Sequence, residues 1–469
     1  MTNHTRAVRR SMTLIVLALV IGAVPLLTVR AAADETLLAQ AQAKIKHVIF
    51  ITQENRSFDN YFGTYPGADG IPMVNGVPTV CVPDPLHGTC IKPFKSTRDV
   101  SVGGPHGALD AAADIDHGKM DGFIKQAEIS LLCNHPAPRC NGEALYDSMA
   151  YYDGKSIPNY WKYANYEVLA DHFFEPIDSW SLPSHLWQLS AWSALCTSSS
   201  DPFSCKNDIA LGNSFTSDLP RNTNFAWTDI TYLLYTHSVS WKYYVVPGYQ
   251  PDCDDSHAMS CSPIDQNSKT PGIWNPLPEF TDVKQDGQLG NIQPVDNYYQ
   301  DAQNGTLPTV SWIVPSRGVS EHPGGQIKQG MAYVTSLINA VMRGPDWDST
   351  AIFLSWDDWG GFYDNVHPPK YDENSYGIRV PMLLISPWAR IGYIDHRTLS
   401  DDSFLKFIED LYMGGSRLDP ATDGRPDPRP DVREAASWTN DLLPEFNFNY
   451  TSPRPPWPQP LYPKTDLVG

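Results

Sequence analysis

Two pairs of oxygen-bearing side chains follow strongly apolar runs in the sequence. Glu54 and Asn55 follow one run, and Asp357 and Asp358 follow another about three hundred positions later. Carboxylate and amide oxygens are the ligands that hard divalent cations prefer in proteins. A single Asp-Asp pair is usually a solvated turn or a helix cap, but two pairs in the same context predict a divalent metal site.

A serine in the segment "SWSLPSHLW" could supply a nucleophile. Ser181 precedes a helical pattern, and a helix N-terminus binds phosphate through its free N–H groups and its dipole. A serine there could attack phosphorus while a metal ion lowers its pKa. The local sequence also fits a plain structural helix cap, and it leaves Ser179 and Ser184 as rival positions.

Two histidines lie in loops rich in glycine and proline. His106 occurs in "GGPHG" and His322 in "SEHPGG". Phosphoryl transfer needs donor groups for the non-bridging oxygens and an acid for the leaving oxygen, and functional residues concentrate in such loops. Each histidine taken alone is more often a surface residue.

Four continuous apolar runs must position these side chains. Continuous runs, unlike alternating ones, suit a parallel sheet covered on both faces, and helical patterns lie between them. We predict helices over Ala332–Val341, ended near Gly344, and over Ser403–Leu411, capped by Ser403. Because ligands bind beyond the carboxyl ends of the strands in such sheets, the side chains above should meet at one edge. The runs are 48–51, 309–314, 351–354 and 382–385.

Composition and organisation narrow the class of protein. The 469 residues include 41% hydrophobic residues, enough for a packed core, and the formal charge of −19 argues against nucleic acid or anionic membranes as partners. We expect one domain over residues 34–415, with long insertions at about 65–150 and 196–300. Residues 416–469 are rich in proline and are expected to pack on the domain surface as a C-terminal segment.

The N-terminus and the cysteines indicate export. Residues 1–33 combine arginines, an apolar stretch and an alanine cluster, which is typical of a signal peptide, with Sec and twin-arginine routes both open. We therefore expect a secreted or periplasmic protein. The eight cysteines form four couples with short gaps, which predict four disulfides rather than a zinc site. The predicted pairs are 81–90, 133–140, 196–205 and 253–261.

The chain also resembles a known family. The opening "HVIFITQENRSFDNYFGTYPGADG" is similar to the signature of the bacterial phosphoesterase family that contains secreted phospholipases C and acid phosphatases of the A type. The resemblance continues in order through "GKMDGF", "NYWKYANYEVLADHFF", "SWSLPSHLW", "VSWKYY", "SEHPGG", "FLSWDDWGGFYDNVHPP" and "YGIRVPMLLISPWAR".

This resemblance implies an α/β fold similar to that of alkaline phosphatase, a three-layer α/β/α sandwich with a mainly parallel sheet. It also implies roles for particular residues. Ser181 falls on the nucleophile position. Ser184 replaces an asparagine that is usual in the family, so one contact of the site is expected either to be missing or to be supplied by His185. The implied catalytic residues are Ser181, His106 and His322, the substrate-binding residues Asn55, Asp121 and His185, and the metal ligands Glu54, Asn55, Ser181, Asp357 and Asp358.

The sequence as a whole predicts a phosphoric ester hydrolase, of phospholipase C or acid phosphatase type, that acts through a phosphoserine. One divalent ion is expected, and the all-oxygen ligand set fits calcium, magnesium or manganese. The expected substrate is a phosphate ester or phospholipid, with at most transient contact with membrane lipid, and we expect a monomer. The alternative is an inactive secreted protein on the same fold that binds phosphate or lipid.

Overall fold

The computed structural model of the chain describes residues 35–130, 142–209, 225–252 and 263–469. The chain divides into two compact units, residues 1–44 and residues 45–469. Residues 35–44 are helical, and the predicted signal peptide lies outside the described residues. Within the described part of the chain, every helix is too short or too polar to cross a membrane.

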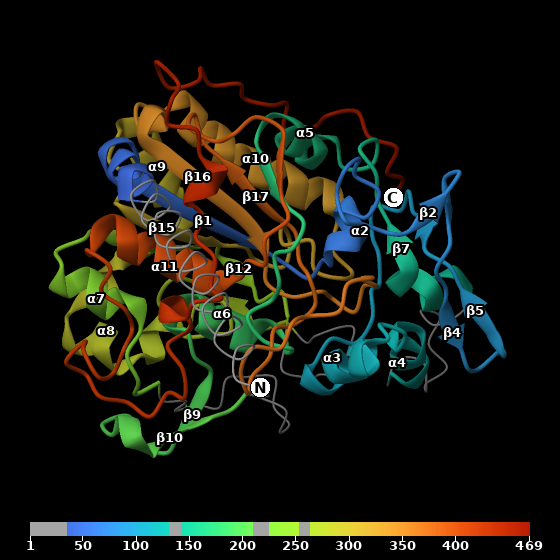
Figure 1. Ribbon diagram of the computed structural model, residues 1–469, viewed down its shortest axis with the longest axis horizontal. Helices are drawn as coiled ribbons and strands as arrows, with labels where there is room; N and C mark the ends of the chain where they lie inside the picture. The colour runs from blue at the N-terminus through green and yellow to red at the C-terminus, as the bar shows by residue number, and fades with distance from the viewer. Residues whose placement is uncertain (1–34, 131–141, 210–224, 253–262) are drawn as a thin grey trace, which may run out of the picture. The chain divides into compact units, whose positions relative to one another are not determined.

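An eight-stranded sheet forms the centre of the second unit (Figure 1). Seven strands run in the same direction, and β17 runs against its two neighbours. In spatial order the strands are β14 (Ile292–Pro294), β11 (Trp241–Val245), β15 (Val310–Val314), β1 (His47–Gln53), β16 (Thr350–Trp356), β17 (Met382–Ile385), β8 (Val168–Ala170) and β18 (Tyr393–Asp395).

Both faces of this sheet are covered, because successive side chains of a strand point to opposite faces. The register aligns Phe50 with Trp312 and with Phe353, and Phe50 lies 4.9 Å from the ring of Phe404 in α11 (Asp401–Tyr412). Tyr244 points to the opposite face, where its ring lies 5.4 Å from that of Tyr298 in α9 (Val295–Asn304). The predicted three-layer α/β/α arrangement with a mainly parallel sheet is confirmed.

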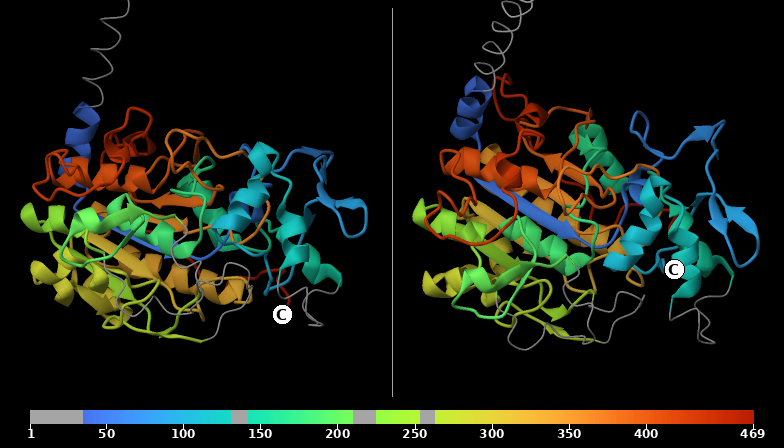
Figure 2. Two further views of the ribbon diagram at one scale, coloured as in Figure 1. Left: turned by 90° about the horizontal axis from the view of Figure 1, so that it is seen from below. Right: turned by 60° about the horizontal axis from the view of Figure 1, so that its bottom comes forward.

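Most of the longer helices beside the sheet form two groups, and the helices within each group contact one another (Figures 1 and 2). The first group is α5 (Pro158–Tyr166), α9 and α10 (Ile327–Arg343), and the second is α6 (Ser181–Ser190), α7 (Ile230–Thr236), α8 (Thr281–Gln285) and α11. Three further helices, α2 (Phe58–Phe62), α3 (Ala108–Ile115) and α4 (Phe123–Ile129), lie with short hairpins at one end of this unit. The hairpin strands are β2 (Met73–Val74), β3 (Val77–Pro78), β4 (Val82–Asp84) and β5 (Thr89–Ile91).

The four predicted strands and both predicted helices are present, with differences in detail. The helix predicted from Ala332 begins earlier, at Ile327, and ends at Arg343, with Gly344 as its C-cap near the expected end. The N-cap of α11 is Ser400 rather than Ser403. Since β17 runs against its neighbours, its carboxyl end lies at the edge of the sheet opposite the other strand ends.

The interpretation of residues 196–300 as an insertion is wrong from α7 onward. β11 and β14 belong to the central sheet, and α7, α8 and α9 pack within the unit. These strands are short and are separated by loops rich in proline and asparagine, so the sequence hides them.

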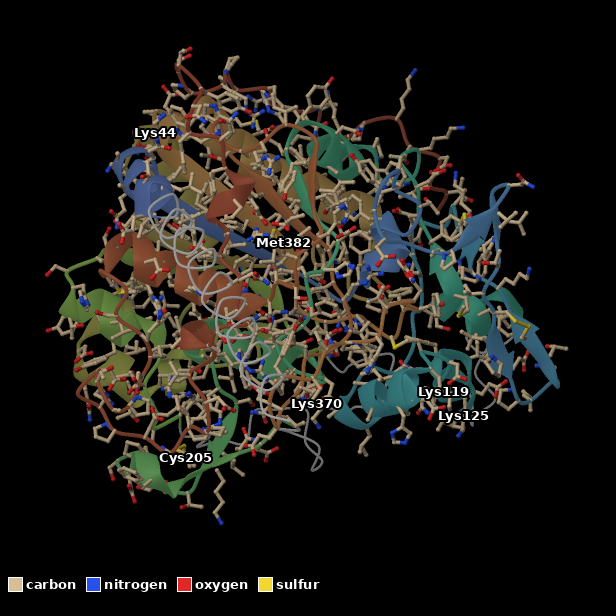
Figure 3. The ribbon with its side chains drawn as sticks, in the orientation of Figure 1. Lys44, Lys119, Lys125, Cys205, Lys370 and Met382 are labelled. Atoms are coloured by element: carbon tan, nitrogen blue, oxygen red, sulfur yellow. A yellow bond between two sulfur atoms is a disulfide. The ribbon has the colours of Figure 1, made fainter. Side chains whose placement is uncertain are left out.

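Two of the four predicted disulfides are confirmed, Cys81–Cys90 and Cys196–Cys205. Cys205 lies on β10 (Cys205–Asn207), at the edge of the unit (Figure 3). The predicted pairs 133–140 and 253–261 lie outside the described residues.

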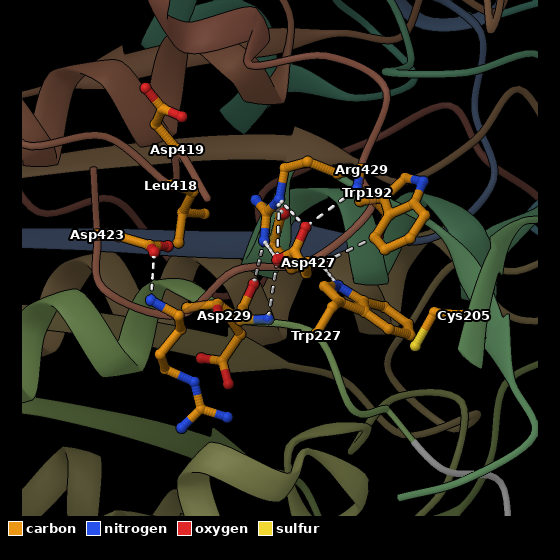
Figure 4. A network of polar contacts seen from close by, with 12 residues as sticks. Trp192, Cys205, Trp227, Asp229, Leu418, Asp419, Asp423, Asp427 and Arg429 are labelled. Atoms are coloured by element: carbon orange, nitrogen blue, oxygen red, sulfur yellow. Dashed lines mark hydrogen bonds and ion pairs between the residues drawn. The ribbon is translucent and has the colours of Figure 1, made fainter. Parts of the chain in front are cut away.

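A buried ion pair ties the segment after α11 to the rest of the unit. The guanidinium of Arg429 donates to both carboxylate oxygens of Asp427, and it also donates to the carbonyl oxygens of Ser190 and Thr228 (Figure 4). Ser190 is the last residue of α6, so this network fixes the end of the helix that begins with Ser181.

Candidate active site

The two predicted oxygen-bearing pairs meet at the carboxyl ends of β1 and β16, which are neighbours in the sheet. The backbone N–H of Asn55 donates to Asp357 Oδ1 at 3.0 Å, and its side-chain amide donates to Asp358 Oδ1 at 2.6 Å. Glu54 and Asp358 are fully buried, and Asp357 is almost so. Side chains three hundred positions apart therefore form one cluster, as the strand pattern predicted.

A glycine after the Asp-Asp pair allows this close approach. Gly360 adopts φ +63°, and a Cβ at this position would lie 2.5 Å from the carbonyl oxygen of Asn55. Asn55 itself has φ +55°, a left-handed conformation that asparagine tolerates better than most residues. The two loops can pack together only with these residue types.

Ser181 belongs to the same cluster and lies in the segment that follows β8. The chain leaves this strand at Ala170 and returns to the cluster at the first residue of α6, one position after the N-cap Trp180. Ser181 Oγ lies 2.9 Å from Asp358 Oδ2 and 3.1 Å from Asp252 Oδ2, and its side chain is fully buried. Its hydroxyl can donate to either carboxylate, so a proton acceptor is at hand when the oxygen attacks an electrophile.

Asp252 links Ser181 to the two predicted histidines. Its Oδ1 lies 3.1 Å from His322 Nε2 and 3.6 Å from His106 Nε2. The Nδ1 atoms of the histidines lie 2.8 Å from the carbonyl oxygen of Gly104 and 2.9 Å from that of Pro323. Because each Nδ1–H donates to a backbone carbonyl, each Nε2 is directed at Asp252.

Asp252 and His106 stabilise each other's charged forms. Burial disfavours the imidazolium of His106, but the Asp252 carboxylate outweighs burial and raises the pKa of His106 to about 10. Burial alone would raise the pKa of Asp252, yet His106 and His322 hold it well below its usual value. At neutral pH, Asp252 and His106 therefore form a buried ion pair beside Ser181.

The acids on the other side of Ser181 show the opposite behaviour. Burial, followed by the charges of Asp357, Asp252 and Asp358, raises the pKa of Glu54 well above its usual value. Burial raises the pKa of Asp357 to about 6, and burial together with Asp357 raises that of Asp358 to about 7. Like charges held together in a dry site require a proton or a cation to neutralise them.

The residues present fit a divalent cation at this position. Among the described residues, five buried atoms of the cluster make no hydrogen bond: Glu54 Oε1 and Oε2, Asn55 Oδ1, Asp357 Oδ2 and His185 Nε2. Glu54, His185 and Asp357 also bring ligand atoms within 4.8 Å of one another. Buried polar atoms are rarely left unpaired, so these atoms are suited to hold an ion.

His185 changes the expected ligand set. Its Nε2 lies 3.4 Å from Asp357 Oδ2, its ring stacks on Trp274 at 4.0 Å, and burial lowers its pKa to about 3. It is therefore neutral at physiological pH, the form in which imidazole binds metals. A nitrogen ligand beside the oxygens departs from the all-oxygen set that the sequence suggested. This mixed ligand set still suits manganese, and it suits zinc in addition.

The remaining predicted residues lie elsewhere. Asp121 is half-exposed and interacts with Asp116 and Lys119, whose ammonium lies on the surface near α4 (Figure 3). Of the rival serines, Ser179 donates to the carbonyl oxygen of Ile209, and Ser184 Oγ is buried without a hydrogen bond among the described residues. Ser181 is the one of the three serines for which the structure shows contacts with the clustered acids.

Asp252 was missed by the sequence reasoning. It lies seven residues after the end of β11, a strand of the central sheet that the apolar runs did not reveal. The rule that predicted the other side chains, a polar residue beyond a strand end, would have found Asp252 had β11 been recognised.

Comparison with known proteins identifies the family of this chain. The model of the Phosphoesterase family matches residues 45–413, which include all the clustered residues. The chain belongs to this family. Its relatives include a non-hemolytic phospholipase C of Burkholderia pseudomallei, 27% identical over 88% of this chain and 60% of that protein. Another is phospholipase C B of Mycobacterium tuberculosis, 25% identical over 78% of this chain and 72% of that protein.

The chain thus spans about 60% or less of the two curated relatives matched first. Among solved structures, the phosphonate monoester hydrolase of Agrobacterium radiobacter is similar over 82% of this chain and 78% of that one, at 9% identity and a TM-score of 0.34.

Proposed function

We propose that this protein is a metal-dependent phosphoric ester hydrolase in which Ser181 is the nucleophile. The observation that carries the proposal is the position of Ser181 Oγ, which contacts Asp358 on the metal-binding side and Asp252 on the histidine side. Membership of the phosphoesterase family and the presence of phospholipases C among its relatives support the same chemistry.

Glu54, Asn55, Asp357 and Asp358, with His185 and Ser181 beside them, would hold one divalent ion. When bound, such an ion supplies positive charge that favours the ionised form of a nearby hydroxyl and withdraws electrons from a phosphoryl group. Calcium, magnesium and manganese suit the oxygens, and the imidazole of His185 adds zinc to the set of ions to be tested.

The reaction would proceed through two displacements at phosphorus. Ser181 Oγ passes its proton to Asp358 and attacks phosphorus, forming an O–P bond while the bond to the leaving oxygen breaks. His106 and His322 bind the non-bridging oxygens through their ring N–H groups, and the imidazolium of His106 can give a proton to the leaving alkoxide. Water then displaces Ser181 from phosphorus and releases the phosphate or phosphoryl headgroup.

The finer features of the protein are also part of this proposal. Residues 1–33 would be a cleaved signal peptide, residues 34–415 the catalytic domain, and residues 416–469 a segment packed on it. The protein would act outside the cytoplasm as a monomer, on phosphate esters or phospholipids, with transient contact with lipid.

A paired assay tests the function and separates it from the inactive binding protein. Hydrolysis of p-nitrophenyl phosphate and p-nitrophenylphosphorylcholine is measured with and without chelator. We expect turnover of at least one ester, its loss on chelation, and a fall of about four orders of magnitude or more in kcat for Ser181→Ala. Ser179→Ala is the matched control. Turnover of neither ester by the metal-loaded protein would favour the binding protein.

A further inference from the structure

Glu321 immediately precedes His322, but the mechanism above does not use it. The side chain of Glu321 is buried, and its backbone adopts φ +70°. This left-handed conformation costs energy for any residue with a Cβ, and it persists only where the surroundings hold it. The surroundings of Glu321 therefore decide the direction in which His322 leaves the backbone.

Two tyrosines hold the carboxylate of Glu321. Tyr61 donates to Oε2 at 2.6 Å, and Tyr160 donates to Oε1 at 2.5 Å. The two tyrosine rings stack at 5.9 Å, and the ring of Trp356 packs edge-on against both. Because Trp356 is the last residue of β16, directly before Asp357, this cage is fixed to the strand that carries the metal-binding pair.

The backbone beside Glu321 is held as well. Arg56 donates to the carbonyl oxygen of Glu321 at 2.5 Å, and its guanidinium lies 4.7 Å from the centre of the Phe362 ring. The carbonyl oxygen of Ser320 accepts from the N–H of Glu54 at 3.0 Å. The loop that carries His322 is thus bound to the loop that carries the Glu-Asn pair.

One glycine makes room for this side chain. Gly330 lies in α10, and a Cβ built on it would come 2.1 Å from Cγ of Glu321 and 2.6 Å from Oε1. Glycine is unfavourable inside a helix, so its presence at this position serves the packing of Glu321.

We propose that Glu321 is a positioning residue that directs the His322 imidazole toward Asp252 and Ser181, through the tyrosine cage and the strained backbone that the cage maintains. The role of His322 in the reaction rests on the proposed function, but its orientation does not. The line of contacts runs from Tyr61 and Tyr160 through Glu321 to His322, whose Nε2 lies 3.1 Å from Asp252 Oδ1.

The variants separate this role from a general contribution to stability. Glu321→Gln keeps the side chain's shape and can pair with both tyrosine hydroxyls, since a hydroxyl also accepts. Glu321→Ala removes the anchor. Glu445→Ala is the matched control, because Glu445 is a fully buried carboxyl whose neighbours Asp395 and Arg397 lie outside the site.

The first readout does not depend on turnover. In protein labelled with ¹³C at histidine Cε1, the His322 signal is assigned by its absence in His322→Gln. We expect Glu321→Ala to shift this signal, and Glu321→Gln and Glu445→Ala to leave it in place. An unshifted signal in Glu321→Ala would overturn the proposal, whether or not the wild-type chain hydrolyses an ester.

The second readout is kinetic. We expect Glu321→Ala to lower kcat for the better ester about 10- to 100-fold, with KM and metal content nearly unchanged, and Glu321→Gln to recover most of the rate. Equal kcat in Glu321→Ala and Glu445→Ala would contradict the role.

If Glu321→Ala fails to fold, Tyr160→Phe removes one of the two anchors and must produce the same effects in weaker form. Failure of the wild-type enzyme on both esters would count against the proposed function alone.

Gly330 supplies an independent check. Gly330→Ala should displace Glu321 and reproduce the loss of kcat in the wild-type background. It should have little further effect in Glu321→Ala, where the Cγ atom it collides with is gone. Additive effects of the two substitutions on kcat would contradict the proposed packing.

Discussion

Four acids surround Ser181, and their environments divide them into two kinds. Asp252 is paired with imidazoles, which keep its pKa low, whereas Glu54, Asp357 and Asp358 have raised pKa values because burial and mutual repulsion disfavour their charges. Acids whose environments separate their pKa values commonly have separate roles in a site. Asp252 pairs with the histidines, and Glu54, Asp357 and Asp358 have the chemistry of cation ligands.

The ion pair between Asp252 and His106 yields a prediction about pH. Since Asp252 is what raises the pKa of His106 to about 10, the imidazolium should persist across neutral pH, and activity should decline only as the pH approaches that value. In Asp252→Asn, burial remains and lowers the pKa of His106, so the alkaline decline of kcat/KM should move to lower pH by several units. A pH profile of kcat/KM for both proteins checks this. An unchanged alkaline limb in the variant would show that His106 is not the titrating group.

At the scale of elements, the sequence predicted the site wherever a long apolar strand precedes it. β1 and β16 led to Glu54 and Asp357, since buried parallel strands have a pattern that sequence alone reveals. β11 is five residues long, with lysine among aromatic residues, so neither it nor Asp252 was predicted. The direction of β17 depends on pairing with distant strands, which no local pattern encodes.

His106 shows a different limit. It lies in a loop between short hairpins and α3, far along the sequence from any strand of the central sheet. Its position beside Asp252 therefore depends on contacts between loops. The glycine- and proline-rich loop made His106 a candidate, and the family resemblance implied its catalytic role. The same resemblance also singled out Asp121, which the structure places next to Asp116 and Lys119 at the surface.

The anchor at the C-terminal end of α6 can be tested by its effect on stability alone, because it lies at the opposite end of the helix from Ser181. Arg429→Ala would leave the buried carboxylate of Asp427 unpaired and release the end of α6, which should cost about 3–5 kcal/mol of unfolding free energy. Urea unfolding measures this cost. Arg425→Ala, in the same segment but more exposed, is the control and should cost about 1 kcal/mol or less. Because Ser181 lies at the other end of α6, kcat of folded Arg429→Ala should stay near the wild-type value.

For the whole molecule, the raised pKa values link stability, pH and metal. The pKa values of Asp357 and Asp358 rise from 3.8 to about 6 and about 7 on folding, so the metal-free folded state binds more protons than the unfolded state. Asp357 and Asp358 should therefore contribute stability to the metal-free protein that is fully present below about pH 4 and is lost as the pH rises through about 7.

A bound cation removes this repulsion, so its stabilising effect should grow over the same range. We expect the rise in Tm on adding manganese or calcium to the chelator-treated protein to be larger at pH 8 than at pH 5. Thermal unfolding at both pH values measures it. An equal or smaller rise at pH 8 would mean that these carboxylates do not hold the ion.

The most direct test of the central claim is to identify the residue that carries the phosphoryl group during turnover. The metal-loaded protein is mixed with p-nitrophenyl phosphate, quenched in acid within the first turnover, digested and analysed by mass spectrometry. We expect a phosphate on Ser181 that is absent from the Ser181→Ala protein. Phosphate on another residue, or turnover with no phosphorylated residue at any quench time, would contradict it.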